Sequence, residues 1–552
     1  MSKRYPAFLV FAFLVSAVLV PLVYAQNSKT EPDGDRPAVQ SSDGSSEDSS
    51  TKTPELRSSA EIFAEYQQKL ENLASKCDER GMTLEAKVTR SLIYKKQPYF
   101  FDVSLLSSKP LEAKLPSDAT KEQQSWYAAL RRLREKYSNE TFAVAERLGA
   151  RKRGYEIVAC VLQTLYINPD HKRARQFMGF SLYEGEWRSQ WEIRRIEKGY
   201  VDDPQFGWLL KDQVEEYHKG KRFYRNQWIT REEEEKKIVA SASGWRIETE
   251  HFSILSRVSL ERGVEIGRYL ESYYDAWIRL FYPFVANENQ WTARLYSNDA
   301  IVSKRHQVIL YRNRAEYVRE LKKHDPNAVQ SVGGYFPSLR CIFVYEPDPK
   351  SVDDAFDLMP MLAHEATHQL FNECNIPNSA RGKSDYSKLA RYANFWAVEG
   401  IAITAETFAL DRAKNKAAMG GFKGVFRIED ALTSLFVDNE YIPLERFIGM
   451  SRTEFQAYED LNLLYSQAAG LAFFFMFYND GAYCNAFVRY LYGVYQGTDT
   501  PDLIVKLTGK SFKQLDEEYK TFMKEIYEQV RQDGERRSPR PEKNAVNVKE
   551  AR

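Results

Sequence analysis

Two histidines one helical turn apart in an apolar segment constrain the fold of this chain more than any other feature. His364 and His368 lie on either side of Glu365 in the run Met-Pro-Met-Leu-Ala-His-Glu-Ala-Thr-His-Gln-Leu-Phe. Residues four apart on an α-helix share one face, so both imidazoles can reach one ion. Because two buried imidazoles without partners would be costly, the pattern favours a metal site over an ordinary core helix. The apolar neighbours that predict burial are Leu358, Leu362, Ala363 and Leu370.

Composition makes a chance origin of this pattern improbable. The chain has only seven histidines in 552 residues, and Asp and Glu together number 77. From these counts fewer than about 0.012 occurrences of His-Glu-x-x-His are expected. Glu365 is rotated only about 100° from His364 around the helix, so it can border a metal without being a ligand. That position suits a general base acting on a water beside the metal.

A zinc site with two histidines needs at least one more protein ligand. Residues 394–406 read Asn-Phe-Trp-Ala-Val-Glu-Gly-Ile-Ala-Ile-Thr-Ala-Glu, an apolar helical pattern around Glu399. Gly400 and Ala402 are small, which lets this helix approach the histidine helix closely. A buried glutamate is rare unless it is paired. We therefore expect Glu399 to be the third ligand rather than a structural capping residue.

Glu406 is a second acidic residue in the same predicted helix. It follows Glu399 by seven residues, about 10.5 Å along the axis, so the two cannot share one ion in an unbroken helix. Two interpretations stay open: Glu406 supports a ligand from behind, or it is simply exposed at the helix end.

The hydrophobic pattern changes at Gly244. Before it, residues 59–240 are expected to be mainly helical; after it, strands come first and helices follow, which predicts an α+β domain over residues 244–532. A long amphipathic helix is expected around residues 264–280. Alternation of period two or short apolar runs predict strands at 245–249, 251–255, 308–311 and 341–345.

Two local patterns stand out in the helical part. Residues 166–175 resemble the turn between a pair of tetratricopeptide-type helices, but no 34-residue period supports a repeat array. A pattern of Tyr-x-x-x-Trp-x-Ser/Thr-x-x-Glu occurs at 183–192 and again at 224–233. Each copy ends in a capping box, so each is expected to form an aromatic turn leading into a helix. Packing of the aromatic residues beneath a loop is favoured over a surface that binds a partner protein.

The N-terminus predicts export. Lys3 and Arg4 precede an uncharged stretch from Tyr5 to Ala25, which is typical of a signal peptide over residues 1–25. The stretch is also long enough to span a bilayer, so an uncleaved anchor, with membrane contact only in that case, is the alternative. Both interpretations place the rest of the chain outside the cytoplasmic membrane: a cleaved signal makes the protein secreted or periplasmic, and an uncleaved segment leaves it anchored.

Length and charge bound the remaining organisation. A chain of 552 residues is too long for one core. Residues 26–58 and 533–552 are rich in polar and charged residues, Pro and Ser, and are expected to be a disordered linker and a disordered tail. The net charge is +1, which argues against a nucleic-acid partner. The run Phe-Phe-Phe-Met-Phe at 473–477 is expected in a core helix, because it is too short for a membrane span.

These motifs resemble a known class of enzymes. His364-Glu365-x-x-His368, followed by Trp-x-x-Glu399-Gly-x-Ala, resembles the gluzincin zinc metallopeptidases of the peptidase MA-like group. The stretch 244–530 is similar to the DUF1570 family of secreted bacterial proteins, including Leu-Thr-Gly-Lys-Ser-Phe at 507–512 near its closing helix. The resemblance implies a zincin-like catalytic domain with zinc (Zn2+) as cofactor, His364, His368 and Glu399 as ligands, and Glu365 as catalytic base. Related sequences often carry Asn or an acidic residue where this chain has Val398.

The activity implied is hydrolysis of peptide bonds in a peptide or protein substrate. The oxyanion of such a reaction needs a further donor, for which Tyr465 is our candidate; Tyr478 and Tyr483 are rivals. The strand 341–345 is either a free edge that pairs with an extended substrate or an ordinary core strand. Two alternatives stay open: an amidase acting on cell-wall peptides, and a non-catalytic envelope protein with a metallopeptidase-like domain. The helical region is a possible surface for a protein partner.

Overall fold

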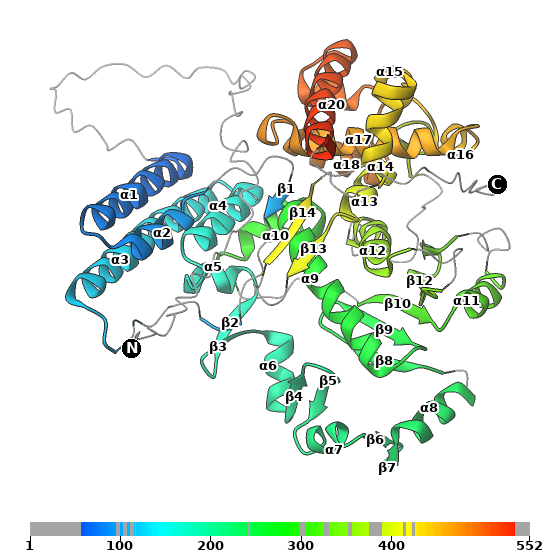
Figure 1. Ribbon diagram of the computed structural model, residues 1–552, viewed down its shortest axis with the longest axis horizontal. Coiled ribbons are helices and arrows are strands. Elements are labelled where there is room, and N and C mark those ends of the chain that lie inside the picture. The colour runs from blue at the N-terminus through cyan, green and yellow to red at the C-terminus, as the bar shows by residue number, and fades with distance from the viewer. Residues whose placement is uncertain are drawn as a thin grey trace, which may run out of the picture.

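The computed structural model shows a mixed α+β protein in which helices predominate and the sheets are small (Figure 1). This confirms the α+β class. The predicted signal peptide, nearly all of the linker and most of the tail lie outside the described residues. The structure describes residues 57–94, 100–102, 108–110, 115, 117–240, 243–297, 305–324, 331–350, 356–374, 389–411, 416–421 and 426–535.

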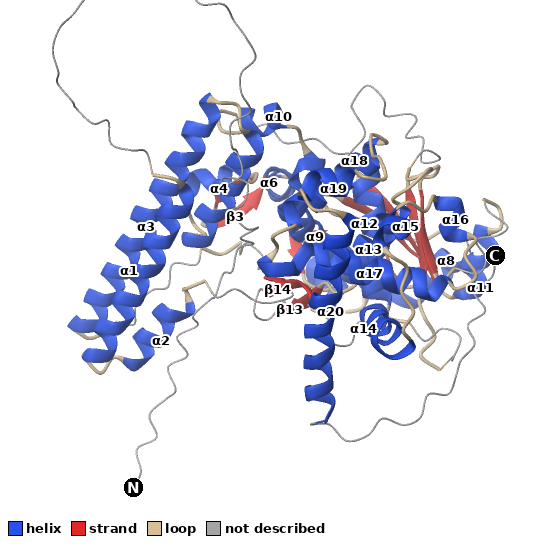
Figure 2. Cartoon of the chain, turned by 90° about the horizontal axis from the view of Figure 1, so that it is seen from above, coloured by secondary structure: helices blue, strands red, loops and turns tan. Residues whose placement is uncertain are grey.

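Long helices pack side by side at the N-terminal end (Figure 2). Helix α1 (Ser59–Glu79) packs on α2 (Thr83–Ser91) and α3 (Lys121–Ala150), and α3 packs on α4 (Gly154–Ile167). A tight turn then leads into α5 (Lys172–Phe177), as the sequence predicts. The imidazole of His171 caps α5 by accepting a hydrogen bond from the Ala174 amide at 3.2 Å.

Three hairpin–helix units follow, where the sequence pattern indicates two. They consist of β2 (Phe180–Tyr183), β3 (Glu186–Ser189) and α6 (Gln190–Glu197); β4 (Tyr200–Asp203), β5 (Gly207–Leu210) and α7 (Val214–His218); and β6 (Lys221–Tyr224), β7 (Gln227–Thr230) and α8 (Arg231–Ala240). The capping boxes at Ser189 and Thr230 are both present. The middle unit lacks a capping box in the sequence, so the repeat pattern does not reveal it.

A five-stranded sheet forms the centre of the C-terminal half. Its order is β11-β12-β10-β9-β8, with β9 parallel to β10, β10 parallel to β12, and antiparallel strands at both edges. The strands are β8 (Trp245–Glu248), β9 (Phe252–Ser256), β10 (His306–Tyr311), β11 (Gly333–Phe336) and β12 (Cys341–Tyr345). Four of the five match predicted strands. The edge strand β11 was not predicted, since its two glycines indicate a turn.

Helices cover both faces of this sheet. Helix α11 (Arg314–Leu321) packs on one face; α9 (Leu260–Val285) and α12 (Leu358–Cys374) pack on the other. Every residue of β12 is buried, with Ile342 and Val344 in the large core and Phe343 in the smaller one. The hypothesis that β12 is a free edge is therefore wrong: β11 occupies that edge and β12 is a core strand.

The remaining helices build an apolar mass beside α12. Helix α13 (Phe395–Ala405) lies between α12 and α17 (Leu461–Phe477). Among the described residues one helix, Leu461–Asp480, is apolar and long enough to cross a membrane, but 72% of its apolar window is buried inside the protein. The run at 473–477 is thus in a core helix, as predicted. Around it lie α14 (Phe426–Thr433), α15 (Leu444–Ile448), α16 (Arg452–Gln456), α18 (Cys484–Gln496), α19 (Leu503–Thr508) and α20 (Phe512–Glu535). Because α20 ends at Glu535, the first three residues of the predicted tail, 533–535, are helical.

The N-terminal region is joined to the rest by shared core and by a shared sheet. Tyr282 of α9 and Trp291 of α10 (Glu288–Ala293) belong to the same apolar cluster as α4. Strand β1 (Phe100–Asp102) pairs with β14 (Lys416–Gly420), which pairs with β13 (Ala409–Asp411). Two segments more than 300 residues apart therefore complete one three-stranded sheet.

Candidate metal centre

Helix α12 carries the two histidines on the side that faces α13. Its other neighbours are the sheet and α9, and Leu362, Ala363, Ala366 and Leu370 are fully buried there. Thr367 adds a polar contact, because its hydroxyl lies 2.6 Å from that of Tyr273 on α9. The helix is therefore held on three sides, which fixes where both imidazoles point.

Helix α13 brings Glu399 to the histidines through a close contact with α17. A Cβ added at Gly400 would lie 2.4 Å from the backbone oxygen of Ala468. The start of α13 is also fixed: Asn394 is fully buried in the left-handed region, and its side chain bonds Asp499 and the Tyr490 hydroxyl. The small residue that the sequence places after Glu399 is thus required by the crossing of two helices.

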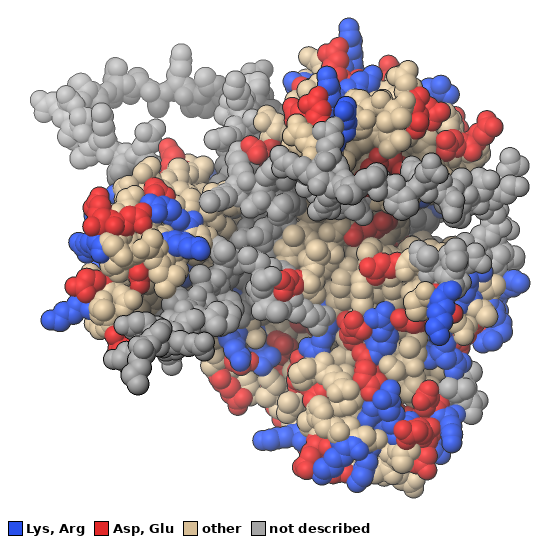
Figure 3. Space-filling model, in the orientation of Figure 1, with Lys and Arg blue, Asp and Glu red and all other residues tan. Residues whose placement is uncertain are grey.

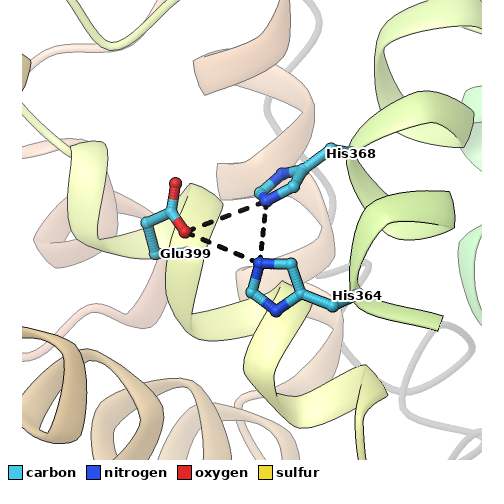
Figure 4. A group of neighbouring side chains, drawn as sticks. All are labelled: His364, His368 and Glu399. Carbon is cyan, nitrogen blue, oxygen red and sulfur yellow. Dashed lines mark hydrogen bonds and ion pairs between the residues drawn. The ribbon is translucent and has the colours of Figure 1, made fainter. Parts of the chain in front are cut away.

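The three predicted ligands converge (Figure 4). His364 Nε2 and His368 Nε2 are 3.1 Å apart, and each lies 3.8 Å from Glu399 Oε2. Three donors placed about 2.1 Å from one ion at tetrahedral angles would be separated by about 3.4 Å. The arrangement therefore fits a zinc-sized ion held by two imidazoles and a carboxylate, the donor set that zinc prefers.

Glu406 occupies a place behind one ligand. It lies at the C-terminal end of α13, and its Oε1 is 2.7 Å from His364 Nδ1. Of the two open interpretations, this contact favours support of His364 over simple exposure at the helix end. Burial lowers the pKa of His364, but the hydrogen bond and charge of Glu406, with the charges of Glu365 and Glu399, outweigh it and raise this pKa to about 9. Such a carboxylate orients the imidazole so that Nε2 is presented to the ion.

Of the other two predicted ligands, His368 is buried and Glu399 is nearly so, with its side chain 12% exposed. Burial and the positive charge of His364 hold the pKa of His368 well below its usual range, so His368 is neutral at pH 7. Its Nδ1 is buried with no hydrogen-bond partner in the part of the chain that the structure describes. Burial also raises the pKa of Glu399 to about 7, against the opposing charge of His364. A cation held by these groups would compensate the unfavourable burial of their polar atoms.

Glu365 lies next to the predicted ligand His364 in the sequence, and a hydrogen bond from the sheet holds its side chain. Its Oε2 accepts a hydrogen bond from the backbone amide of Tyr335, on β11, at 2.7 Å. The residue is 7% exposed, and burial raises the pKa of its carboxyl group. A carboxylate with two oxygens can commit one to an amide and use the other to take a proton.

The structure places the candidate oxyanion residues apart: Tyr465 near the start of α17, Tyr478 just after its end, and Tyr483 at the start of α18. Tyr465 precedes by one turn Ala468, where α13 crosses, and its ring packs against Phe455. Tyr478 lies ten residues past that crossing, about 15 Å along the helix. The hydroxyl of Tyr483 donates to Glu518 on α20. Tyr465 is therefore nearer than Tyr478 to the crossing along α17, and its role as oxyanion donor stays a prediction.

Comparisons with known proteins give no match: no family model fits this chain, and no curated protein is similar to it. The resemblance to gluzincins and to DUF1570 therefore rests on the motif residues and their geometry.

Sequence reasoning missed the contacts that support the site. No residue pattern marks Tyr335, because it acts through its backbone amide. Asn394 could have been found as a polar residue at the start of an apolar helix, although its left-handed backbone gives no signal.

Proposed function

We propose that this protein is a zinc-dependent metallopeptidase of the gluzincin type, secreted or periplasmic, with a zincin-like catalytic domain. One observation carries the proposal: Nε2 of His364, Nε2 of His368 and Oε2 of Glu399 come from two helices and meet within 3.8 Å. Glu365 is adjacent to these ligands and is not one of them, which a hydrolytic site needs and a purely structural zinc site does not.

In the proposed hydrolysis of a peptide bond, Glu365, Glu406 and Tyr465 have separate roles. Bound zinc would supply Lewis acidity toward the scissile carbonyl and toward a water molecule. Glu365 takes the proton of that water and returns it to the leaving amine. Glu406 holds His364 in the orientation that binds the metal, and Tyr465 is the proposed donor to the oxyanion.

Peptides or proteins are the proposed substrates, and the net charge of +1 argues against a nucleic-acid partner. On the face shown in Figure 3, Lys and Arg alternate with Asp and Glu over the described residues, so no extended basic patch covers it. The non-catalytic alternative, an envelope protein that binds a partner through its helical region, shares the metal site and differs in having no use for Glu365.

Metal analysis and hydrolysis assays of the full-length protein test the proposal. After reconstitution we expect about one zinc per chain in the wild type and none in His364→Ala. His324→Ala is the matched control, because His324 is an exposed histidine of the same domain. Removing zinc with a chelator should abolish cleavage of a mixture of quenched fluorescent peptides.

Glu365→Gln separates the enzyme from the binding protein. We expect this variant to keep its zinc and to hydrolyse peptides about 100-fold to 10,000-fold more slowly than the wild type. A wild type without zinc would refute the metal site. A variant that holds zinc and cleaves as fast as the wild type would refute Glu365 as base, and no cleavage by either protein would favour the non-catalytic alternative.

A further inference from the structure

A stripe of buried polar side chains runs along α12 away from the metal centre. We call Glu365, Gln369, Asn372 and Glu373 the polar stripe; all four are buried and face the sheet. Gln369 follows Glu365 by four residues, and Asn372 and Glu373 follow Gln369 by three and four, so all lie toward one side of the helix. The proposed function uses only the first of them. Buried polar groups need partners, and these groups contact the strand region and, between Gln369 and Glu373, each other.

Glu373 anchors the far end of the polar stripe. Its Oε2 is 3.0 Å from His306 Nδ1 on β10 and accepts a hydrogen bond from Arg340 at 2.8 Å. Its Oε1 accepts from Gln369 at 3.2 Å and from the hydroxyl of Tyr335 at 3.3 Å. Burial raises the pKa of Glu373, but His306 and Arg340 outweigh burial and hold this pKa below its usual range. Glu373 therefore stays ionised and fixes these groups to the helix.

Tyr335 connects the two ends of the stripe. Its hydroxyl accepts a hydrogen bond from Asn372 at 2.8 Å and donates to Glu373, while its own backbone amide donates to Glu365 at 2.7 Å. One residue of the edge strand thus contacts the proposed base through its main chain and the anchor through its side chain.

The position of Tyr335 matters because β11 is an edge strand. Among the described strands, β11 pairs only with β12. Side-chain contacts must therefore supply the restraint that a second neighbouring strand would give. The Tyr335 hydroxyl is the side-chain contact that joins this strand to α12 at the level of Glu373.

We propose that Tyr335 is a positioning residue for the hydrolytic reaction: its hydroxyl, held by Asn372 and Glu373, keeps β11 where the Tyr335 amide fixes the carboxylate of Glu365. This inference rests on the proposed function, because it gives the polar stripe a role in orienting the base. It concerns orientation and contact, and the metal ligands themselves take no part in it.

Tyr335→Phe in the full-length protein tests the proposal, since it keeps the ring and removes only the hydroxyl. Misplacement of a reacting group by a fraction of an ångström to 1 Å costs about 10-fold to 100-fold in rate. We expect kcat to fall by that factor with KM within twofold of the wild type and with zinc content unchanged. We also expect hydrogen exchange of the Tyr335 amide to become at least about 10-fold faster, because this amide is protected by Glu365.

Tyr317→Phe is the matched control. Its hydroxyl lies 2.6 Å from that of Ser331, and its ring packs in the small core on the opposite face of the sheet. We expect Tyr317→Phe to leave kcat and the exchange of the Tyr335 amide unchanged. Equal losses of kcat in both variants would mean a merely structural role and would overturn the proposal.

Hydrogen exchange keeps the test independent of activity. If the wild type cleaves no peptide, the proposed function fails, and exchange alone decides whether the hydroxyl positions the strand. Unchanged exchange of the Tyr335 amide in Tyr335→Phe overturns the inference whatever the activity; faster exchange there and not in Tyr317→Phe supports it.

Discussion

At the scale of single residues, the hydrogen bond between Glu406 and His364 makes a specific prediction about metal affinity. Glu406→Gln keeps the size of the side chain and removes its charge, so the imidazole loses basicity and a fixed orientation. We expect zinc affinity to fall about 10-fold to 100-fold. Competition with a fluorescent chelator measures it.

Glu459→Gln is the control for Glu406→Gln, because Glu459 is exposed on the surface of the same region. Its zinc affinity should equal that of the wild type. A change of less than twofold in Glu406→Gln would show that this carboxylate does not tune the site.

The convergence of the three predicted ligands could be predicted from the sequence, and the contacts that support them could not. The spacing of His364 and His368 predicts that they share one face of a helix. The small residue after Glu399 predicts that its helix packs closely against another. Glu406 could be placed only to the end of that helix, because the side on which it meets His364 depends on how α12 and α13 cross. The hydrogen bond from the Tyr335 backbone amide to Glu365 cannot be predicted from residue type, because every residue except proline has such an amide.

At the scale of elements, an ion pair joins the β8–β9 turn to α9. His251 Nδ1 is 2.7 Å from Glu271 Oε2, and the imidazole stacks on Tyr274. Burial lowers the pKa of His251, but the charge and hydrogen bond of Glu271 outweigh burial and raise this pKa above 6.5. For Glu271 the directions are reversed: burial raises its pKa, but His251 outweighs burial and lowers this pKa below 4.5. The contribution of His251 is complete below pH 6.5 and is lost as pH rises through its raised pKa. That of Glu271 is complete above pH 4.5 and is lost as pH falls.

His251→Gln therefore should be most destabilising between about pH 4.5 and 6.5. We expect a loss of about 1 kcal/mol in this window, shrinking toward pH 9 and toward pH 3. Thermal unfolding of the zinc-free protein measures it, so that metal binding does not contribute. An equal loss at pH 5.5 and pH 9 would contradict an ionic origin.

Elements with a regular pattern were predicted, and irregular ones were missed. The alternation in β8 and β9 and the apolar run in β12 are strong local signals. Strand β11 begins with two glycines, β13 has three residues, and β14 (Lys-Ala-Ala-Met-Gly) has no β-branched or aromatic residue, so pairing rather than residue preference makes them strands. The same reason explains the correction for β12. Because β11 was not predicted, the sequence could not show that β12 is an interior strand.

At the scale of the whole molecule, two glycines hold helices at close contact in different places. Gly400 meets the Ala468 backbone in the metal centre, and a Cβ at Gly154 would lie 2.1 Å from the Glu288 backbone, where α4 meets α10. Substitution of either by Ala should cost about 1–3 kcal/mol of folding stability through overpacking. Only Gly400→Ala should also weaken zinc binding, because it displaces the helix that carries Glu399.

Paired measurements of thermal unfolding and zinc affinity on Gly400→Ala and Gly154→Ala check this prediction. Equal losses of zinc affinity in both variants would mean that the metal centre responds to any loss of stability. Unchanged affinity in Gly400→Ala would mean that α12 and α13 adapt independently of α17.

The pairing of β1 with β14 has a practical consequence for anyone who wishes to isolate the C-terminal half. A fragment starting at residue 244 would leave one side of β14 with its amides and carbonyls unsatisfied. Such an open ladder recruits strands from other molecules, so the truncated protein should self-associate at concentrations where the intact chain stays dispersed. Strand β1 thus covers an edge of β14 that would otherwise be open to other molecules, although the two strands are more than 300 residues apart in the sequence.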